Sequence, residues 1–345
     1  MRVGLVLGAG GVLGASWLIG ALDAVESETG WCAADADRIV GTSAGSVIGA
    51  LVAAGVEPAA MAAYASGASL DGFAEAEARA GAVAERISGS EYRFQVSMPP
   101  IGPGSWRLAF STLMHPKRHA PSVMLAGWLP RGFISTAPIQ ELVERFIPDP
   151  WPGHPSYWAV AADYASGRRV AFGREGAPAA SVGEAVAASC AIPAFYHPVT
   201  VAGRRYVDGG ICSVSNLDLL RGDELDLVIC LNPMSSIAQA TGGSPADRFA
   251  AVMRAAAGRR LGHEARKLRE EGTKVLLLQP GSDDCSLMGL NLMSGTRRVE
   301  VMEQARQSVA RDLRRVRAKD GLLPCRSDGA RAPARRRPAA SRRAA

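Results

Sequence analysis

Residues 38–55, RIVGTSAGSVIGALVAAG, decide the fold of this chain. The apolar beginning of the stretch predicts a short buried strand, and the small and apolar residues after it predict a helix. Between them, Gly41, Ser43 and Gly45 form a GxSxG pattern on a strand-to-helix turn. Glycines on both sides of a serine permit a sharp turn and a close helix–strand approach, which presents the hydroxyl at the carboxyl edge of the sheet. The stretch therefore predicts a nucleophilic Ser43, the alternative being a serine that only caps the helix.

The N-terminus repeats this strand–turn–helix order. Residues 2–7, RVGLVL, predict a buried strand, residues 8–14 a glycine-rich loop, and residues 15–28 a helix. The chain has 345 residues, of which 48 % are hydrophobic, so it can bury a sizeable core. The expected fold class is α/β, with helices packed on a sheet.

A serine nucleophile needs a base, and the sequence offers two kinds. His263 is the only histidine after Asp208, as a Ser–Asp–His order would require, but it lies in a basic stretch that predicts a solvated helix. Asp208 follows a strand-like run and precedes Gly209 and Gly210, so it is expected at a sharp turn. A carboxylate within hydrogen-bond reach of the hydroxyl can serve as the base. An ordinary Asp-Gly turn is the alternative for this motif.

Residues 7–14, LGAGGVLG, offer the donors that a developing oxyanion needs. Gly10 and Gly11 supply successive backbone N–H groups ahead of a helix, and Gly8 and Gly14 frame them. A dinucleotide-binding fingerprint is the rival interpretation of this loop. It fits poorly, because Leu13 occupies the place of the third glycine and the nearby acids fall within the predicted helix.

The three motifs, in this order, resemble the patatin-like phospholipases over roughly residues 2–232. Residues 188–199, ASCAIPAFYHPV, and residues 209–220, GGICSVSNLDLL, resemble the segments that flank the aspartate of this family. The resemblance implies a three-layer α/β/α sandwich and a Ser–Asp dyad in which Ser43 is the nucleophile and Asp208 the base. It also implies oxyanion donors at Gly10 and Gly11, no metal and no cofactor. The implied activity is hydrolysis of carboxylic esters in lipids, of the phospholipase A or lysophospholipase type.

The chain departs from the family pattern in the glycine-rich loop. Leu13 stands where the family carries a basic residue, and Ala9 where it carries a glycine. Backbone donors survive both changes, whereas a side-chain contact from the basic residue does not. If that contact orients the substrate, Leu13→Arg should raise kcat/KM on anionic lipids. The departure keeps open an alternative function as a non-catalytic lipid- or nucleotide-binding protein on the same scaffold.

Charge is concentrated at the C-terminus. Residues 326–345 hold seven arginines and one aspartate, which accounts for the whole formal net charge of +6. A globally basic nucleic-acid-binding domain is therefore not expected, and no specific nucleic acid is predicted as a partner. The resemblance implies an acyl hydrolase domain, which we place over residues 1–323, and the composition predicts a disordered Arg/Pro/Ala-rich tail over 324–345.

Residues 95–133 form a second segment of distinct composition, with six prolines, two tryptophans and no clean period. They predict either a lid or an interfacial insertion, so that this segment and the tail could contact an anionic membrane surface. No apolar run reaches the ~20 residues that span a bilayer, and the glycines in the N-terminal run argue against a signal peptide. The six scattered cysteines form no zinc pattern and favour a reducing compartment. The expected location is cytoplasmic, peripheral on the membrane.

Overall fold

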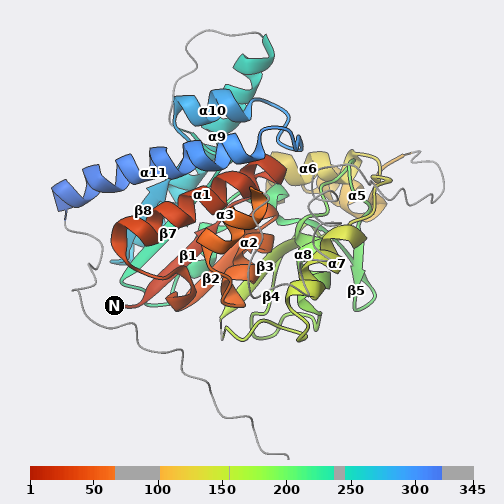
Figure 1. Ribbon diagram of the computed structural model, residues 1–345. Helices are drawn as coiled ribbons and strands as arrows, with labels where there is room; N and C mark the ends of the chain where they lie inside the picture. Colours follow the sequence, from red (N-terminus) through yellow and green to blue (C-terminus); the bar gives the residue numbers. More distant parts are fainter. Residues whose placement is uncertain (67–101, 155, 237–244, 321–345) are drawn as a thin grey trace, which may run out of the picture.

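A mixed β-sheet forms the centre of the molecule (Figure 1). The computed structural model describes residues 1–66, 102–154, 156–236 and 245–320. The strands lie in the order β5-β6-β3-β2-β1-β7-β8, and β4 also pairs with β3. Strands β3, β2, β1, β7 and β8 are parallel neighbours, whereas β4 and β6 run antiparallel to β3. The strand bounds are β1 (Val3–Leu7), β2 (Arg38–Thr42), β3 (Tyr157–Asp163), β4 (Arg169–Phe172), β5 (Val199–Val201), β6 (Arg204–Asp208), β7 (Leu227–Leu231) and β8 (Lys274–Leu278).

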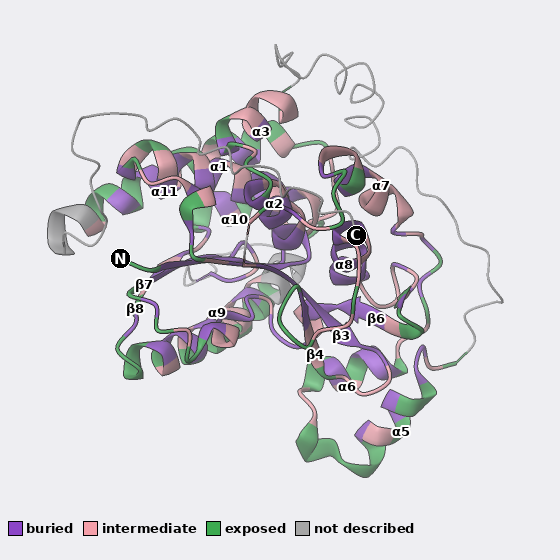
Figure 2. Ribbon diagram, turned by 90° about the horizontal axis from the view of Figure 1, so that it is seen from below, coloured by how far each residue is buried: buried purple, intermediate pink, exposed green. Residues whose placement is uncertain are grey.

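Helices cover both faces of this sheet. The α-helices of the described residues are α1 (Gly11–Thr29), α2 (Ala44–Ala53), α3 (Pro58–Ala65), α5 (Trp106–Met114), α6 (Pro121–Trp128), α7 (Ala137–Phe146), α8 (Val182–Ser189), α9 (Pro245–Glu270), α10 (Ser282–Met288) and α11 (Arg298–Asp320). Figure 2 shows α1, α2, α8 and α11 on one face and α9 on the other. Helices α5 and α6 lie beyond the β3–β6 side of the sheet (Figure 2).

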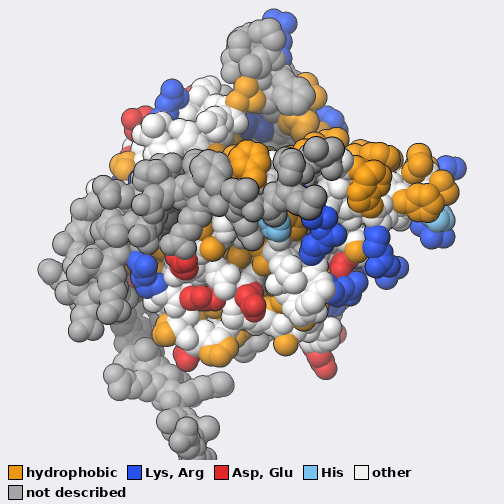
Figure 3. Space-filling view, turned by 90° about the vertical axis from the view of Figure 1, so that its right-hand side faces the viewer, with side chains coloured by type: hydrophobic (Ala, Val, Ile, Leu, Met, Phe, Trp, Pro, Cys, Tyr) orange, Lys and Arg blue, Asp and Glu red, His pale blue; other side chains and the backbone are white. Residues whose placement is uncertain are grey.

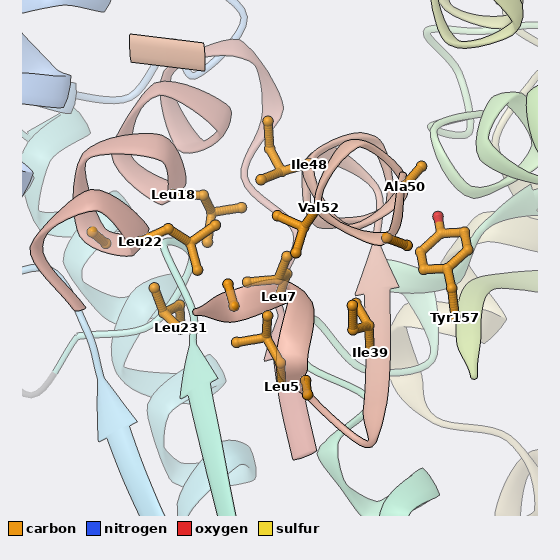
Figure 4. Close-up of a cluster of buried hydrophobic side chains, with 14 of the residues drawn as sticks. Leu5, Leu7, Leu18, Leu22, Ile39, Ile48, Ala50, Val52, Tyr157 and Leu231 are labelled. Carbon is orange, nitrogen blue, oxygen red and sulfur yellow. The ribbon is translucent and has the colours of Figure 1, made fainter. Parts of the chain in front are cut away.

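Alternation along the strands divides the hydrophobic core between the two faces. Leu5, Leu7 and Ile39 point to the face covered by α1 and α2, where Figure 4 shows them interleaved with helix side chains. Val6 and Val40 point to the opposite face and pack in the cluster that contains the buried leucines of α9. Because β1, β2, β3 and β7 are buried on both faces, they appear as nearly continuous apolar runs in the sequence, whereas β8 at the edge of the sheet is partly exposed.

The predicted N-terminal elements are present, with one shift. Strand β1 confirms the strand expected over residues 2–7, and α2 follows β2 as the opening stretch predicts. Helix α1 begins at Gly11 rather than near residue 15, so the second half of the glycine-rich loop is the first turn of the helix. The first turn passes close to Pro233 and to the Leu292 carbonyl, and glycines at positions 10 and 11 leave no side chain to collide with them.

The structure describes part of the predicted insertion, residues 95–133, and none of the predicted tail, residues 324–345. Within 95–133, the described residues form α5, a 3₁₀ turn at Pro116–Arg118 and α6. Residues 95–101 and the tail 324–345 lie outside the described part of the chain. Among the described residues, no helix is both long enough and apolar enough to cross a membrane.

Candidate active site

Ser43 lies on the turn between β2 and α2. Its backbone has φ 54° and ψ −123°, a conformation that costs a non-glycine residue energy and is typical of a nucleophile elbow. Gly45 has no room for a side chain, because a Cβ there would collide with the Leu7 carbonyl at the end of β1. The small residue lets α2 start directly against the sheet, which is the reason for the GxSxG spacing.

Ser189, at the end of α8, anchors the elbow from the side. The Ser43 N–H donates to Ser189 Oγ at 2.9 Å, and the Ser189 hydroxyl donates to the Val160 carbonyl of β3 at 2.6 Å. Asn216 adds a second anchor, since its Nδ2 donates to Thr42 Oγ1 at 3.0 Å. Both residues lie in segments that resemble the family, but the sequence alone assigned them no role.

The sheet brings Asp208 to Ser43 across 165 residues of chain. In the register of β3 with its neighbours, Thr42 lies opposite Val160 and Asp208 lies opposite Ala161. The Ser43 hydroxyl lies close enough to the Asp208 carboxylate to favour its ionised form, and the Gly210 N–H donates to Asp208 Oδ1 at 2.7 Å. Both side chains are nearly closed to solvent, with residue exposures of 4 % for Ser43 and 5 % for Asp208.

Burial changes the acid–base behaviour of this pair. Desolvation of the carboxylate raises the pKa of Asp208 to about 6, even though the Gly210 N–H and the Ser43 hydroxyl favour the charged form. The carboxylate is therefore ionised at neutral pH and holds a proton more tightly than an exposed aspartate does. Burial also raises the pKa of the neighbouring Cys190 thiol, so this cysteine stays protonated behind the pair.

The Gly10 and Gly11 amides stand at the start of α1 without acceptors among the described residues. Gly11 has φ 61°, a left-handed conformation that favours glycine. Pro233 packs against Gly10 and Gly14, and Met293 packs against Gly11. These flanking residues lie after β7 and after α10, so no local sequence pattern indicates their contact with the loop. The remaining motif glycines lie at the same edge: Gly8 after β1, Gly41 in β2, and Gly209 and Gly210 after β6.

Leu13 does not face the site, which reverses the expectation for Leu13→Arg. Its side chain is 2 % exposed and belongs to the core cluster between α1 and the sheet. Its N–H donates to the Leu292 carbonyl at 2.9 Å. A basic side chain at this position would enter the core rather than orient a substrate.

We therefore expect Leu13→Arg to lower the free energy of unfolding by roughly 3 kcal/mol or more, because a buried guanidinium would lack a partner. Urea denaturation followed by circular dichroism measures this effect. The matched control is Leu13→Met, which conserves volume and should cost less than about 1.5 kcal/mol. A Leu13→Arg variant of unchanged stability and raised kcat/KM on anionic lipids would restore the original expectation.

The contacts of the described residues support neither a Ser–Asp–His triad with His263 nor a dinucleotide-binding loop. His263 is exposed on α9, and the hydrogen bonds of the described residues join no histidine to Ser43 or Asp208. Glu26, one of the acids of α1 that a dinucleotide-binding loop would use to bind the ribose, accepts the Ala33 N–H at 2.7 Å. In the described ranges, no three His, Cys, Asp or Glu side chains gather as a metal-ligand set.

Three comparisons with known proteins bear on this arrangement. Among solved structures, the type III effector protein ExoU has 16 % sequence identity and a TM-score of 0.36, with 91 % of this chain and 53 % of that chain covered. VipD from Legionella pneumophila has 12 % identity and a TM-score of 0.38, with 90 % and 67 % covered. The ExoU–SpcU complex from Pseudomonas aeruginosa gives 17 % identity and a TM-score of 0.36, with 91 % and 51 % covered.

The chain thus spans about half the length of the ExoU chains that it matches. No curated protein matches it. The family model described as Patatin-like phospholipase matches residues 5–221, which is more than half of the chain and includes the glycine-rich loop, the Ser43 elbow and the Asp208 turn. On this match, the chain belongs to the patatin-like phospholipase family.

Proposed function

We propose that this protein is a serine acyl hydrolase that cleaves carboxylic ester bonds of lipids, of the phospholipase A or lysophospholipase type. The observation that carries the proposal is the approach of the Ser43 hydroxyl to the Asp208 carboxylate, both buried, at the end of the strands. Family membership supports a lipid as the substrate.

The proposed reaction uses Ser43 and Asp208 as a dyad. The Ser43 oxygen attacks the ester carbonyl carbon while Asp208 accepts the hydroxyl proton. The Gly10 and Gly11 N–H groups stabilise the oxyanion of the tetrahedral intermediate. Asp208 then gives its proton to the leaving alcohol, and an acyl-Ser43 ester remains. A water molecule attacks this ester with Asp208 again as the base, which releases the fatty acid and restores the serine. These groups supply nucleophile, base and oxyanion donors, so the proposed reaction needs no metal and no cofactor.

A fluorophosphonate probe tests this proposal on the purified protein. An activated serine should form a stoichiometric covalent adduct, and mass spectrometry of the digested protein should locate it on the peptide that contains Ser43. Heat-denatured protein is the control for non-specific labelling, and a parallel sample with EDTA tests independence from metals. A non-catalytic lipid- or nucleotide-binding protein would not label, and that outcome would overturn the proposal.

The proposed substrate also bears on where the protein acts. Phospholipids are aggregated in bilayers, so we propose that the protein works as a peripheral membrane protein in the cytoplasm. The scattered cysteines support a reducing compartment, since the described ones are free thiols.

A further inference from the structure

Helices α5 and α6 expose a set of large apolar side chains, here called the apolar ridge. More than half of the large hydrophobic residues that are exposed among the described residues lie between 106 and 133. The ridge consists of Trp106, Phe110, Leu113 and Met114 of α5 and of Leu125 and Trp128 of α6. Large exposed apolar patches on a protein mark contacts with a partner or a membrane.

The ridge is a second apolar face on helices that are already packed. In α5, Trp106, Phe110 and Leu113 repeat at helical spacing and point outward, whereas Leu108 and Ala109 are buried. In α6, Val123, Ala126 and Gly127 are buried, whereas Leu125 and Trp128 are exposed. The inner faces pack against β3 and β6 in a cluster that contains Ala162 and Val207. Packing on the sheet therefore uses only the inner faces of these helices and does not account for the large apolar side chains of the ridge.

The charge of the segment that carries the ridge has one sign. Residues 102–133 contain four basic side chains and no Asp or Glu, and all four are exposed: Arg107, Lys117, Arg118 and Arg131. Figure 3 looks onto this side of the molecule, where hydrophobic side chains gather beside Lys and Arg. Tryptophan and basic residues together are typical of surfaces that enter the headgroup region of a bilayer, because indole rings and long basic side chains have an apolar body and a polar tip.

The ridge also lies next to the candidate active site. The Ser122 hydroxyl of α6 donates to the carbonyl of Ile211, three residues after Asp208. The Tyr164 hydroxyl, just after β3, donates to the Ala126 carbonyl of α6 at 3.1 Å. A surface seated on the ridge would therefore lie beside the turn that carries Asp208.

From these observations we infer that the apolar ridge docks the protein on a bilayer that contains anionic phospholipids. The apolar side chains enter the acyl boundary, while Arg107, Lys117 and Arg118 pair with lipid phosphates. A second copy of this chain fits the ridge less well, because two copies of the segment 102–133 would bring eight cationic groups together and contribute no acid to pair them. This inference rests on the proposed function only in that docking would bring the enzyme to its lipid substrate. Vesicle binding and ester hydrolysis are measured separately, so either one can fail without the other.

Vesicle sedimentation tests the inference with the full-length chain. Vesicles of ether-linked phosphatidylcholine, with or without ether-linked phosphatidylserine, keep binding separate from ester hydrolysis. Two variants remove parts of the ridge and its rim: Trp106→Ala with Trp128→Ala, and Lys117→Gln with Arg118→Gln. Their matched controls change exposed residues of α9: Val252→Ala with Met253→Ala, and Arg259→Gln with Arg266→Gln.

The tryptophan variant should partition onto both vesicle types at least about tenfold more weakly than the unmodified protein, since each indole removed from the bilayer loses apolar burial. The basic variant should lose binding to phosphatidylserine vesicles at low salt and differ little at high salt. The α9 controls should bind as the unmodified protein does, and all four variants should hydrolyse a short soluble ester at the normal rate. Equal losses in ridge and control variants, or unchanged partitioning of both ridge variants, would overturn the inference. The inference would also be overturned if the unmodified protein formed a dimer in the absence of lipid and the tryptophan variant did not. The ridge would then be a protein interface.

Discussion

Replacing Ser43 with alanine is expected to lower the rate of ester hydrolysis by roughly four orders of magnitude or more, because the variant has no atom that can form the acyl-enzyme. The fold should survive, since the elbow is anchored through backbone atoms. The Ser43 N–H donates to Ser189, and the Ser43 carbonyl accepts the Ser46 N–H at 2.8 Å, and alanine keeps both bonds. The change in unfolding free energy should stay within about 1 kcal/mol.

Hydrolysis of a short soluble ester and fluorophosphonate labelling measure this loss together. Both should vanish in Ser43→Ala, while the circular dichroism melt stays close to that of the unmodified protein. Ser27→Ala, at an exposed serine of α1, is the matched control and should keep full activity. Turnover above background in Ser43→Ala would contradict the assignment of the nucleophile.

Replacing Asp208 with asparagine is expected to abolish hydrolysis and to stabilise the protein at neutral pH. An amide cannot accept the serine proton, so the loss of rate should be about a thousandfold or more. The stability effect follows from the raised pKa of Asp208, since its ionised form is desolvated in the folded protein. A pKa near 6, against about 4 in an unfolded chain, corresponds to at most about 3 kcal/mol of destabilisation when the group is ionised.

The sign of this effect depends on pH. Below pH ~4 the carboxyl is protonated in both states, and its favourable contribution to stability is fully present. That contribution is lost as the pH rises through the folded pKa of about 6. Asp208→Asn should therefore raise the free energy of unfolding at pH 7.5 and leave it nearly unchanged at pH 4. The kcat/KM of the unmodified protein should fall about tenfold per unit below pH 6, because the base becomes protonated.

Asp218 provides a control of opposite sign. Burial alone would raise the pKa of Asp218, but its ion pair with Arg169 outweighs burial and lowers it. Asp218→Asn should therefore destabilise the protein at neutral pH, an effect that is lost as the pH falls through the depressed pKa. Urea titrations of both variants at pH 4 and pH 7.5 measure the two effects. An Asp208→Asn variant that is active, or less stable at pH 7.5, would contradict the proposed base.

The sequence by itself determined those parts of the protein that depend on interactions between residues close together in the chain. The apolar runs of β1 and β2, the glycines beside Ser43 and the turn after Asp208 act within a few residues, so the sequence predicted them near their observed places. The start of α1 at Gly11 was missed because glycine is compatible with both a loop and a first helical turn.

Only the tertiary structure decided which of these parts meet. The approach of Ser43 to Asp208 depends on the register of β2, β3 and β6, because strand pairing is set by contacts far apart in the chain. The direction of a side chain was equally inaccessible to sequence: Leu13 turned out to be a core residue, although its place in the loop suggested the site. The apolar residues of α5 and α6 lacked a clean period because two apolar faces overlap in one short helix pair, and packing on β3 and β6 selects the inner face and leaves the other exposed.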